Sequence, residues 1–333
     1  MDYDVLVVGN PLMDQLVFVE DEVLKQTGVE PGSMSLIDMP DIARLAKLTN
    51  GAVMASGGSE TNTAVGIAEF GGTVKLLGAL ADDDIGKHYQ ANLDKYSNLK
   101  VDFDVYPSAE YGVGTGISLV FVSPNGERTM LTYLGASTLL EDKSIDKVTA
   151  DTAKAVYFDG YILDLAAGNK ITQKLLSYAR ASQAKIVFGL ADVNVVARHH
   201  EAILDLVTQV DILLANEAEI NSLTGADNPH EAVEIASKHL SQIAVTLGAQ
   251  GALVYDDGLL LNLNTPEVSA VIDTTGAGDQ FAAGICFGVA RGISLKDSAL
   301  LGMKAASEVI AHMGARPTAG WAESFRSINY NQS

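Results

Sequence analysis

The sequence has little that would suit an exported or membrane-spanning protein. Among its 333 residues there is one cysteine, Cys286, so no disulfide can form within the chain. No apolar run is long enough to span a bilayer. The first ten residues, MDYDVLVVGN, lack the basic segment of a signal peptide. These features predict a cytoplasmic protein in which Cys286 is a buried structural thiol.

Positive charge is also scarce. Lysine and arginine total 22 against 42 aspartates and glutamates, which gives a net charge of −20 and a pI near 4.5. Such a chain is a poor partner for nucleic acid or an anionic membrane surface. It can still bind a nucleotide at a local anion site. With 47% hydrophobic and 19% charged residues, the chain is predicted to be globular with a large core.

Two common nucleotide-binding motifs are missing. No G-x-x-x-x-G-K-[ST] occurs, which excludes a P-loop kinase. No G-x-G-x-x-G follows the first strand-like run, Asp4 to Gly9, which argues against an NAD-dependent oxidoreductase.

What the chain does contain is a glycine-rich stretch, Asp273 to Asp279, between a strand-like run (268–272) and a helix-like run (280–291). Gly276, Ala277 and Gly278 would bring backbone N–H groups and a helix N-terminus close to an anion. Asp279 would then lie beside that anion hole as a proton acceptor. The spacing alone is equally compatible with a glycine-rich helix start whose first-turn acid stabilises the helix dipole.

The second half of the sequence alternates strands and helices. Apolar runs at 155–158, 185–190, 211–214 and 243–247 are separated by helical patterns at 170–182, 195–208 and 216–223. This alternation predicts an α/β fold with a mainly parallel central sheet covered on both faces.

The first half predicts a smaller β-sheet. Runs at 101–106, 115–122 and 128–133 favour antiparallel strands, with a hairpin at Asn125-Gly126. Together with short strands near 16–37 they predict a sheet beside the main unit. We assign residues 1–10, 40–105 and 136–333 to a main nucleotide-binding and catalytic domain, and residues 11–39 and 106–135 to a small lid.

Read as a whole, DTTGAGDQFAAG closely resembles the C-terminal signature of the PfkB (ribokinase-like) carbohydrate and nucleoside kinase family. Other matching segments extend from Gly9 to about Thr318. The resemblance implies a three-layer ribokinase-like fold with a β-sheet lid. It also implies that Asp279 is the catalytic base and that Gly276, Ala277 and Gly278 form the anion hole for the transferred phosphoryl group.

Further segments imply an acceptor site. GNPLMD, ending at Asp14, is similar to the N-terminal motif of adenosine kinases, in which the final Asp holds ribose hydroxyls; from position alone, Asp14 is a turn residue. SGGSETN resembles the family's GG-x-x-x-N signature, which implies that Gly57, Gly58 and Asn62 line the sugar site. The alternative is an ordinary helix start capped by Ser59 or Thr61. Glu60 departs from the pattern, because many relatives have a small residue there.

The resemblance also implies residues for nucleotide and metals. Asn216 and Glu219 match an N-x-x-E motif that affects magnesium and phosphate binding, with Glu219 acting on Mg²⁺ through water; the local alternative is a capping box. Four positions match a monovalent-cation (K⁺) site that is variable in the family. The implied ATP contacts are Thr246, Gly248, Gly251 and His312, Arg128 is a candidate for bracing phosphate charge, and the K⁺ positions are Asp273, Thr275, Gly314 and Thr318.

The implied activity is ATP-dependent phosphorylation of a primary hydroxyl. GNPLMD favours adenosine as the acceptor, giving AMP, while the remaining motifs also suit a ribokinase- or fructokinase-type sugar kinase. A catalytically silent nucleotide- or sugar-binding regulator on the same fold is a third hypothesis. The partners expected are small molecules, with the chain as a monomer or homodimer.

Overall fold

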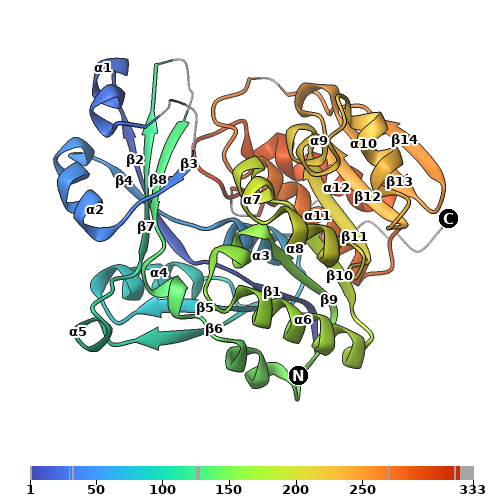
Figure 1. The fold of residues 1–333 in the computed structure, drawn as a ribbon, viewed down its shortest axis with the longest axis horizontal. Helices are drawn as coiled ribbons and strands as arrows, with labels where there is room; N and C mark the ends of the chain where they lie inside the picture. The colour runs from blue at the N-terminus through green and yellow to red at the C-terminus, as the bar shows by residue number, and fades with distance from the viewer. Residues whose placement is uncertain are drawn as a thin grey trace.

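The computed structural model describes residues 2–29, 31, 34–124, 128–268, 270–318 and 320–322. Within these residues the chain forms two sheets, a large one and a smaller one that stands beside it at the left of Figure 1. The α/β class with a mainly parallel central sheet and a second, smaller sheet is therefore confirmed.

The large sheet has nine strands among the described residues, and those from β12 through β6 are all parallel. In spatial order they are β14 (Leu259–Leu263), β13 (Ala252–Asp256), β12 (Gln242–Thr246), β11 (Ile212–Asn216), β10 (Lys185–Gly189), β9 (Thr152–Asp159), β1 (Asp2–Val8), β5 (Val74–Ala81) and β6 (Leu99–Tyr106). Only β13 and β14 run antiparallel to their neighbours.

Helices cover both faces of this sheet, which gives the three layers predicted. β1 shows why: Val5 and Val7 belong to one buried cluster, and Leu6 and Val8 belong to the other. The first cluster packs against α3 (Ser59–Glu69), α4 (Asp84–Leu93), α11 (Ala277–Ala290) and α12 (Leu295–Val309). The second packs against α6 (Gly168–Ser182), α7 (Val193–Arg198), α8 (His200–Val207), α9 (Glu217–Thr224) and α10 (Pro229–Ala236). A strand apolar on both faces is typical of a parallel sheet.

The smaller sheet is mixed rather than antiparallel, since β2 pairs parallel with β7 and β3 pairs parallel with β8. Its order is β3 (Met34–Leu36), β8 (Arg128–Tyr133), β7 (Gly116–Val122), β2 (Leu12–Phe18) and β4 (Val53–Gly57). One face packs a small core against α1 (Asp21–Leu24) and α2 (Met39–Leu45), which lie on its outer side in Figure 1.

Two strand predictions and one domain assignment differ from the structure. The run at 101–106 belongs to β6, an edge strand of the large sheet, because it pairs parallel with β5 over eight residues. β4 pairs with β2 in the smaller sheet, although residues 40–105 were assigned to the main domain. The run at 268–272 forms no strand at its described positions; Val271 and Ile272 are more than half exposed. The predicted Asn125-Gly126 turn lies outside the described residues, although β7 and β8 do pair antiparallel.

Short helical turns connect the remaining segments. These are α5 (Ser108–Tyr111) and the 3₁₀ turns η1 (Lys25–Thr27), η2 (Ala46–Thr49), η3 (Gly135–Leu139), η4 (Asp142–Val148), η5 (Gly160–Asp164) and η6 (Gly248–Gln250). No helix within the described ranges is both long and apolar enough to cross a membrane.

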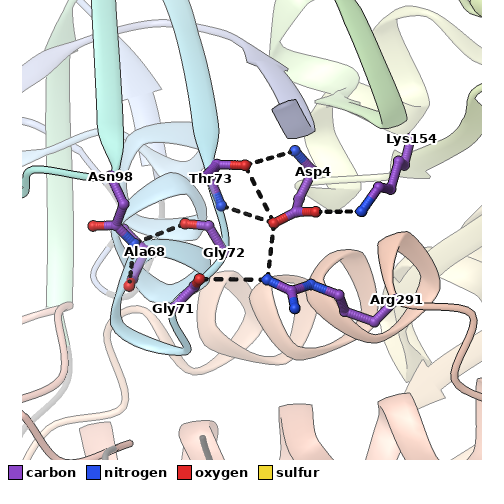
Figure 2. Close-up of polar contacts among 8 residues, drawn as sticks. All are labelled: Asp4, Ala68, Gly71, Gly72, Thr73, Asn98, Lys154 and Arg291. Atoms are coloured by element: carbon purple, nitrogen blue, oxygen red, sulfur yellow. Dashed lines mark hydrogen bonds and ion pairs between the residues drawn. The ribbon is translucent and has the colours of Figure 1, made fainter. Parts of the chain in front are cut away.

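A buried carboxylate ties β1 to three other segments at the amino end of the strand (Figure 2). Asp4 accepts hydrogen bonds from the backbone N–H of Thr73 at 2.9 Å, from Lys154 Nζ at 2.8 Å and from Arg291 Nη2 at 3.0 Å. Burial acts to raise the pKa of Asp4, but the hydrogen bonds from Lys154 and Thr73 and the charge of Arg291 outweigh it and lower the pKa. The cluster joins the C-terminal end of α11 to the central strand.

Candidate active site

Two neighbouring cavities meet at the N-terminal ends of α3 and α11. One, of about 190 Å³, lies against the smaller sheet; the other, of about 100 Å³, lies against β9–β12. Ser59, Ala191 and Asp279 line both. A group bound in the first cavity would therefore meet a group bound in the second beside Asp279.

Glycine fixes the backbone at the start of α11. Gly276 is the N-cap with φ of 78°, and a Cβ there would lie 2.3 Å from the carbonyl oxygen of Ala315, so no other residue fits without movement. A Cβ on Gly278 would meet nothing within 4 Å, and Gly278 lines the second cavity. The first N–H groups of the helix have no intrahelical partner, which suits the predicted anion hole of Gly276, Ala277 and Gly278.

Asp279 is held by two side chains from α3. Its Oδ1 accepts from Ser59 Oγ at 2.9 Å and its Oδ2 from Asn62 Nδ2 at 2.9 Å. Burial raises the pKa of the Asp279 carboxyl, and the two hydrogen bonds and the charge of Arg316 reduce that rise. A raised pKa makes the carboxylate a stronger base than a surface aspartate.

The residues predicted for the acceptor meet in the first cavity. Asp14, Gly58 and Asn62 line it, and Asp14 projects from β2 rather than from a turn. Gly57 has another role: a Cβ there would lie 2.1 Å from Asp14 Oδ2, so this glycine makes room for the carboxylate. Arg316 Nε donates to Asn62 Oδ1 at 3.1 Å, which fixes the orientation of the Asn62 amide.

The N-x-x-E residues meet in the second cavity. Asn216 and Glu219 form a capping box at the start of α9, with Asn216 N and Nδ2 donating to the Glu219 carboxyl at 2.8 and 2.7 Å. Both line the cavity, as does Thr246. Burial raises the pKa of Glu219 to about 7, partly offset by the backbone bond from Asn216. A buried carboxyl facing a phosphate-sized space fits a Mg²⁺ ion held through water.

Three residues predicted for ATP lie away from these two cavities. Gly248 and Gly251 border η6 beyond β12, both with positive φ. His312 follows α12 and lies 3.5 Å from Glu308 Oε1. Their contact with ATP stays a prediction.

The residues predicted for K⁺ do not fit a cation as they stand. The Asp273 carboxylate, 1% exposed, is ion-paired with Arg128 and accepts from the N–H groups of Thr275 at 2.9 Å and Gly314 at 2.8 Å. Arg128 thus already supplies the positive charge that Asp273 requires. The fourth position, Thr318, instead donates to Glu308.

Sequence reasoning missed several residues of the site. Asp159 follows the apolar strand β9 and lines the second cavity; an acid at the carboxyl end of a parallel strand was a usable signal. Ser59 was interpreted only as a cap, whereas Gly58 is the N-cap and the Ser59 hydroxyl faces Asp159 and Asp279. Arg316 carries no local signal, because its partner Asn62 is 254 residues away.

Comparison with known proteins identifies the family and supports the fold. The model of the pfkB family carbohydrate kinases matches residues 34–321. Two solved structures each align with a TM-score of 0.90 at 32% identity over 97% of this chain: adenosine kinase from Sinorhizobium meliloti, covered to 98%, and a probable sugar kinase from Rhizobium etli, covered to 97%.

A curated relative is named as a sugar kinase. The probable chloroplastic fructokinase-6 of Arabidopsis thaliana is 30% identical over 256 residues, which is 72% of this chain and 64% of the fructokinase. The family match extends over most of the chain and includes every residue that lines the second cavity; of the residues that line the first cavity, Asn10, Leu12 and Asp14 precede it. The chain therefore belongs to the PfkB carbohydrate kinase family, whose members are phosphotransferases with an alcohol group as acceptor.

Proposed function

We propose that the protein transfers the γ-phosphoryl group of ATP to a primary hydroxyl of a nucleoside, with adenosine as the first candidate. The observation that carries this proposal is the mixed lining of the first cavity. Asn10, Asp14 and Asn62 contribute hydrogen-bonding groups, the hydroxyls of Ser118 and Thr132 are bonded to each other, and five further residues are apolar. The apolar residues are Leu12, Met34, Leu36, Met130 and Leu134.

A nucleoside combines polar and weakly polar surface in the same way. Its ribose presents hydroxyls that a carboxylate and an amide can bind, and its base presents a flat, weakly polar face that aliphatic side chains can cover. A free hexose or pentose presents hydroxyls all round, and burying those against leucine and methionine would leave them without partners. The similarity to the adenosine kinase structure supports the same choice.

Each group in the site has a part in the transfer. Asp279 removes the proton from the acceptor hydroxyl, and the oxygen attacks the γ-phosphorus in line. The N–H groups at Gly276 to Gly278 stabilise the charge on the transferring group. Asp14 and Asn62 hold the acceptor, Glu219 orients water, and Arg128 adds positive charge near the loop that precedes α11. Mg²⁺, when bound, neutralises charge on the phosphates.

A sugar kinase is the second candidate, because one structure at 32% identity is named as a probable sugar kinase and curated relatives include fructokinases. The test is ADP release from Mg-ATP with adenosine, ribose, fructose or no acceptor. Adenosine-dependent release supports the proposal, whereas release only with a sugar moves the protein to the second candidate. Release with none of them contradicts both.

The same assay tests the base. Asp279→Asn should lower kcat by about 10²–10⁴-fold, the range for loss of general-base catalysis, while ATP affinity stays within a few-fold. Asp297→Asn is a matched control, since Asp297 also lies in the first turn of a helix but outside both cavities. Turnover in Asp279→Asn equal to that in the control would show that Asp279 is not the base.

A further inference from the structure

The hydroxyl of Ser59 lies between two carboxyl groups. Its Oγ is 2.8 Å from Asp159 Oδ2 and 2.9 Å from Asp279 Oδ1. Both distances are hydrogen-bond lengths, and each such contact needs one hydrogen. A serine hydroxyl has only one hydrogen to donate. The second hydrogen must therefore come from a carboxyl group, so Asp159 and Asp279 are not both ionised when both contacts are made.

A third carboxyl group, that of Glu60, lies next to Asp159 in this series of polar groups. Glu60 follows Ser59 in α3, is 1% exposed, and its carboxyl lies beside that of Asp159, which is also 1% exposed. Its Oε2 accepts from the N–H of Asn10 at 3.2 Å, but Oε1 has no donor aimed at it. That atom is satisfied if Glu60 is protonated and donates to Asp159. The backbone is built around this side chain, since a Cβ on Gly9 would lie 2.0 Å from Glu60 Cδ.

The electrostatics of the cluster agree with this proton count. Burial and the Asp159 charge raise the pKa of Glu60 well above its usual range. Burial raises the pKa of Asp159 to about 6, and hydrogen bonds from Ser59 and Glu60 limit that rise. Asp159 can therefore exchange a proton near neutral pH, and it lines the second cavity, through which solvent can reach it.

We propose that Glu60, Asp159 and Ser59 form a proton relay that empties the catalytic base Asp279 after each transfer. The inference rests on the proposed function only in taking Asp279 as the base. Ser59, Asp159 and Glu60 are positioning residues, because in the relay they act through Asp279. Glu60 keeps its proton throughout the cycle and serves as a fixed hydrogen-bond donor to Asp159.

The relay conserves atoms and charge. At the start Asp279 is ionised and Asp159 is protonated, as the single hydrogen of Ser59 requires. Asp279 gains the proton of the acceptor hydroxyl, and Asp159 releases its own proton to water in the second cavity. Asp279 then donates its proton to Ser59 Oγ, while the original Ser59 O–H bond breaks and its proton passes to Asp159 Oδ2, which restores the starting state. One O–H bond forms for each that breaks, and no other reactant is required. Asp279 is ionised again without having to open the acceptor cavity to solvent.

Other charged or titratable groups lie near the relay residues, on the elements packed around them. They are Asp14 on β2, Tyr157 on β9, Tyr161 on η5, Glu219 on α9 and Arg316 after α12. Asp14 and Glu219 also have raised pKa values, of about 7. Both ionise as pH rises through about 7, so Glu60 is identified by comparing wild type with a Glu60 variant at one pH.

The first experiment does not depend on turnover. With all samples at the same pH, infrared absorption should show a protonated carboxyl that disappears in Glu60→Gln and persists in Asp82→Asn, a control that removes a carboxyl with a lowered pKa. If wild type and Glu60→Gln have the same absorption, Glu60 holds no proton and the proposal is overturned. This result stands whether or not adenosine is the acceptor.

The second experiment measures kcat against pH, with whichever acceptor gives turnover. Ser59→Ala and Asp159→Asn should each lower kcat at least tenfold, with the acceptor KM within twofold of wild type. The double variant should have a kcat no lower than the single variants, because either substitution alone already interrupts the relay. Ser59→Thr, which keeps the hydroxyl, should stay close to wild type. Losses that multiply in the double variant would show two independent structural roles and overturn the relay.

Glu60 gives a third, directional readout. Glu60→Gln keeps a donor to Asp159 and should leave the pH profile unchanged. Glu60→Ala removes that donor, so Asp159 holds its proton more tightly and the acidic limb should move to higher pH by about one unit. Asp159→Asn removes a like charge beside Asp279 and should move that limb to lower pH. A profile that is the same in Glu60→Ala and wild type would contradict the proposal.

Discussion

Asp14 allows the acceptor site to be tested without catalysis. Burial raises the pKa of its carboxyl to about 7; the charges of Arg316 and Arg128 lower it and that of Asp279 raises it. Only the carboxylate can accept hydrogen bonds from two acceptor hydroxyls. At pH 6 about nine-tenths of the protein would have Asp14 protonated. We therefore expect the Kd of the acceptor to rise about tenfold for each pH unit below 7.

Replacing Asp14 by Asn should remove that dependence. A hydrogen bond to a charged group contributes about 1.5–3 kcal/mol, so the Kd at pH 8 should increase about 10- to 150-fold. The same substitution should increase the free energy of unfolding at pH 8, although it weakens acceptor binding. The pKa of Asp14 rises from 3.8 to about 7 on folding, a shift that corresponds to about 4 kcal/mol at most. Because the pKa is raised, this cost appears as pH rises from about 4 to 7, and Asp14→Asn should be more stable than wild type at pH 8 but not at pH 4.

The assay is titration calorimetry of the acceptor without ATP between pH 5.5 and 8.5, with urea unfolding at pH 4 and pH 8. The same titration in Asp279→Asn separates the effects of the Asp14 and Asp279 carboxyl groups, because this variant lacks the second and should keep the pH dependence caused by the first. A wild-type Kd that does not change with pH would refute the assignment of Asp14 to the acceptor. A variant less stable than wild type at pH 8 would refute the reasoning from burial.

Four further results are expected. Glu219→Gln should raise the Mg²⁺ concentration needed for half-maximal rate about tenfold, and in wild type that concentration should rise as pH falls below about 7, since protons compete for Glu219. Asp4→Asn should lower the free energy of unfolding by about 1–3 kcal/mol at neutral pH with kcat unchanged; the pKa of Asp4 is lowered on folding, so the difference should vanish as pH falls below about 4. Gly278→Ala should fold normally, because its Cβ meets nothing within 4 Å, but should raise the KM of ATP. Replacing K⁺ by tetramethylammonium should leave kcat within twofold, because Asp273 is paired with Arg128.

Local patterns predicted the large sheet well and the smaller sheet less well. The strands from β9 to β12 are short apolar runs with helices between them, so each could be recognised alone. The assignment of β4 and β6 to their sheets depends on partners instead: β4 pairs with β2, about forty residues earlier, and β6 pairs with β5. The run at 268–272 is apolar and β-branched, yet the N–H of Ile272 bonds to the carbonyl of Ile310 after α12 and not to a strand.

The site residues, too, could be predicted where the signal was local and not where it depended on distant partners. Asp279, Asn216 and Glu219 lie in motifs whose spacing is local, and the structure places all three on the second cavity. Ser59 and Arg316 could not be assigned, because the atoms they contact are 100 or more residues away in sequence. A hydroxyl at the start of a helix is most often a cap, and only the positions of Asp159 and Asp279 show that this one is not.

Glu60 was the one departure from the family signature in its segment, and the residues around it leave space for its side chain. A buried, unpaired carboxyl costs several kcal/mol, yet the chain provides Gly9 to make room for it, the Asn10 N–H for one oxygen and Asp159 as acceptor for the other. A similar arrangement surrounds Asp14, for which Gly57 leaves the space. In both places the chain places an acid where a side chain on the facing residue would collide with it. Burial then raises both pKa values above those of surface acids.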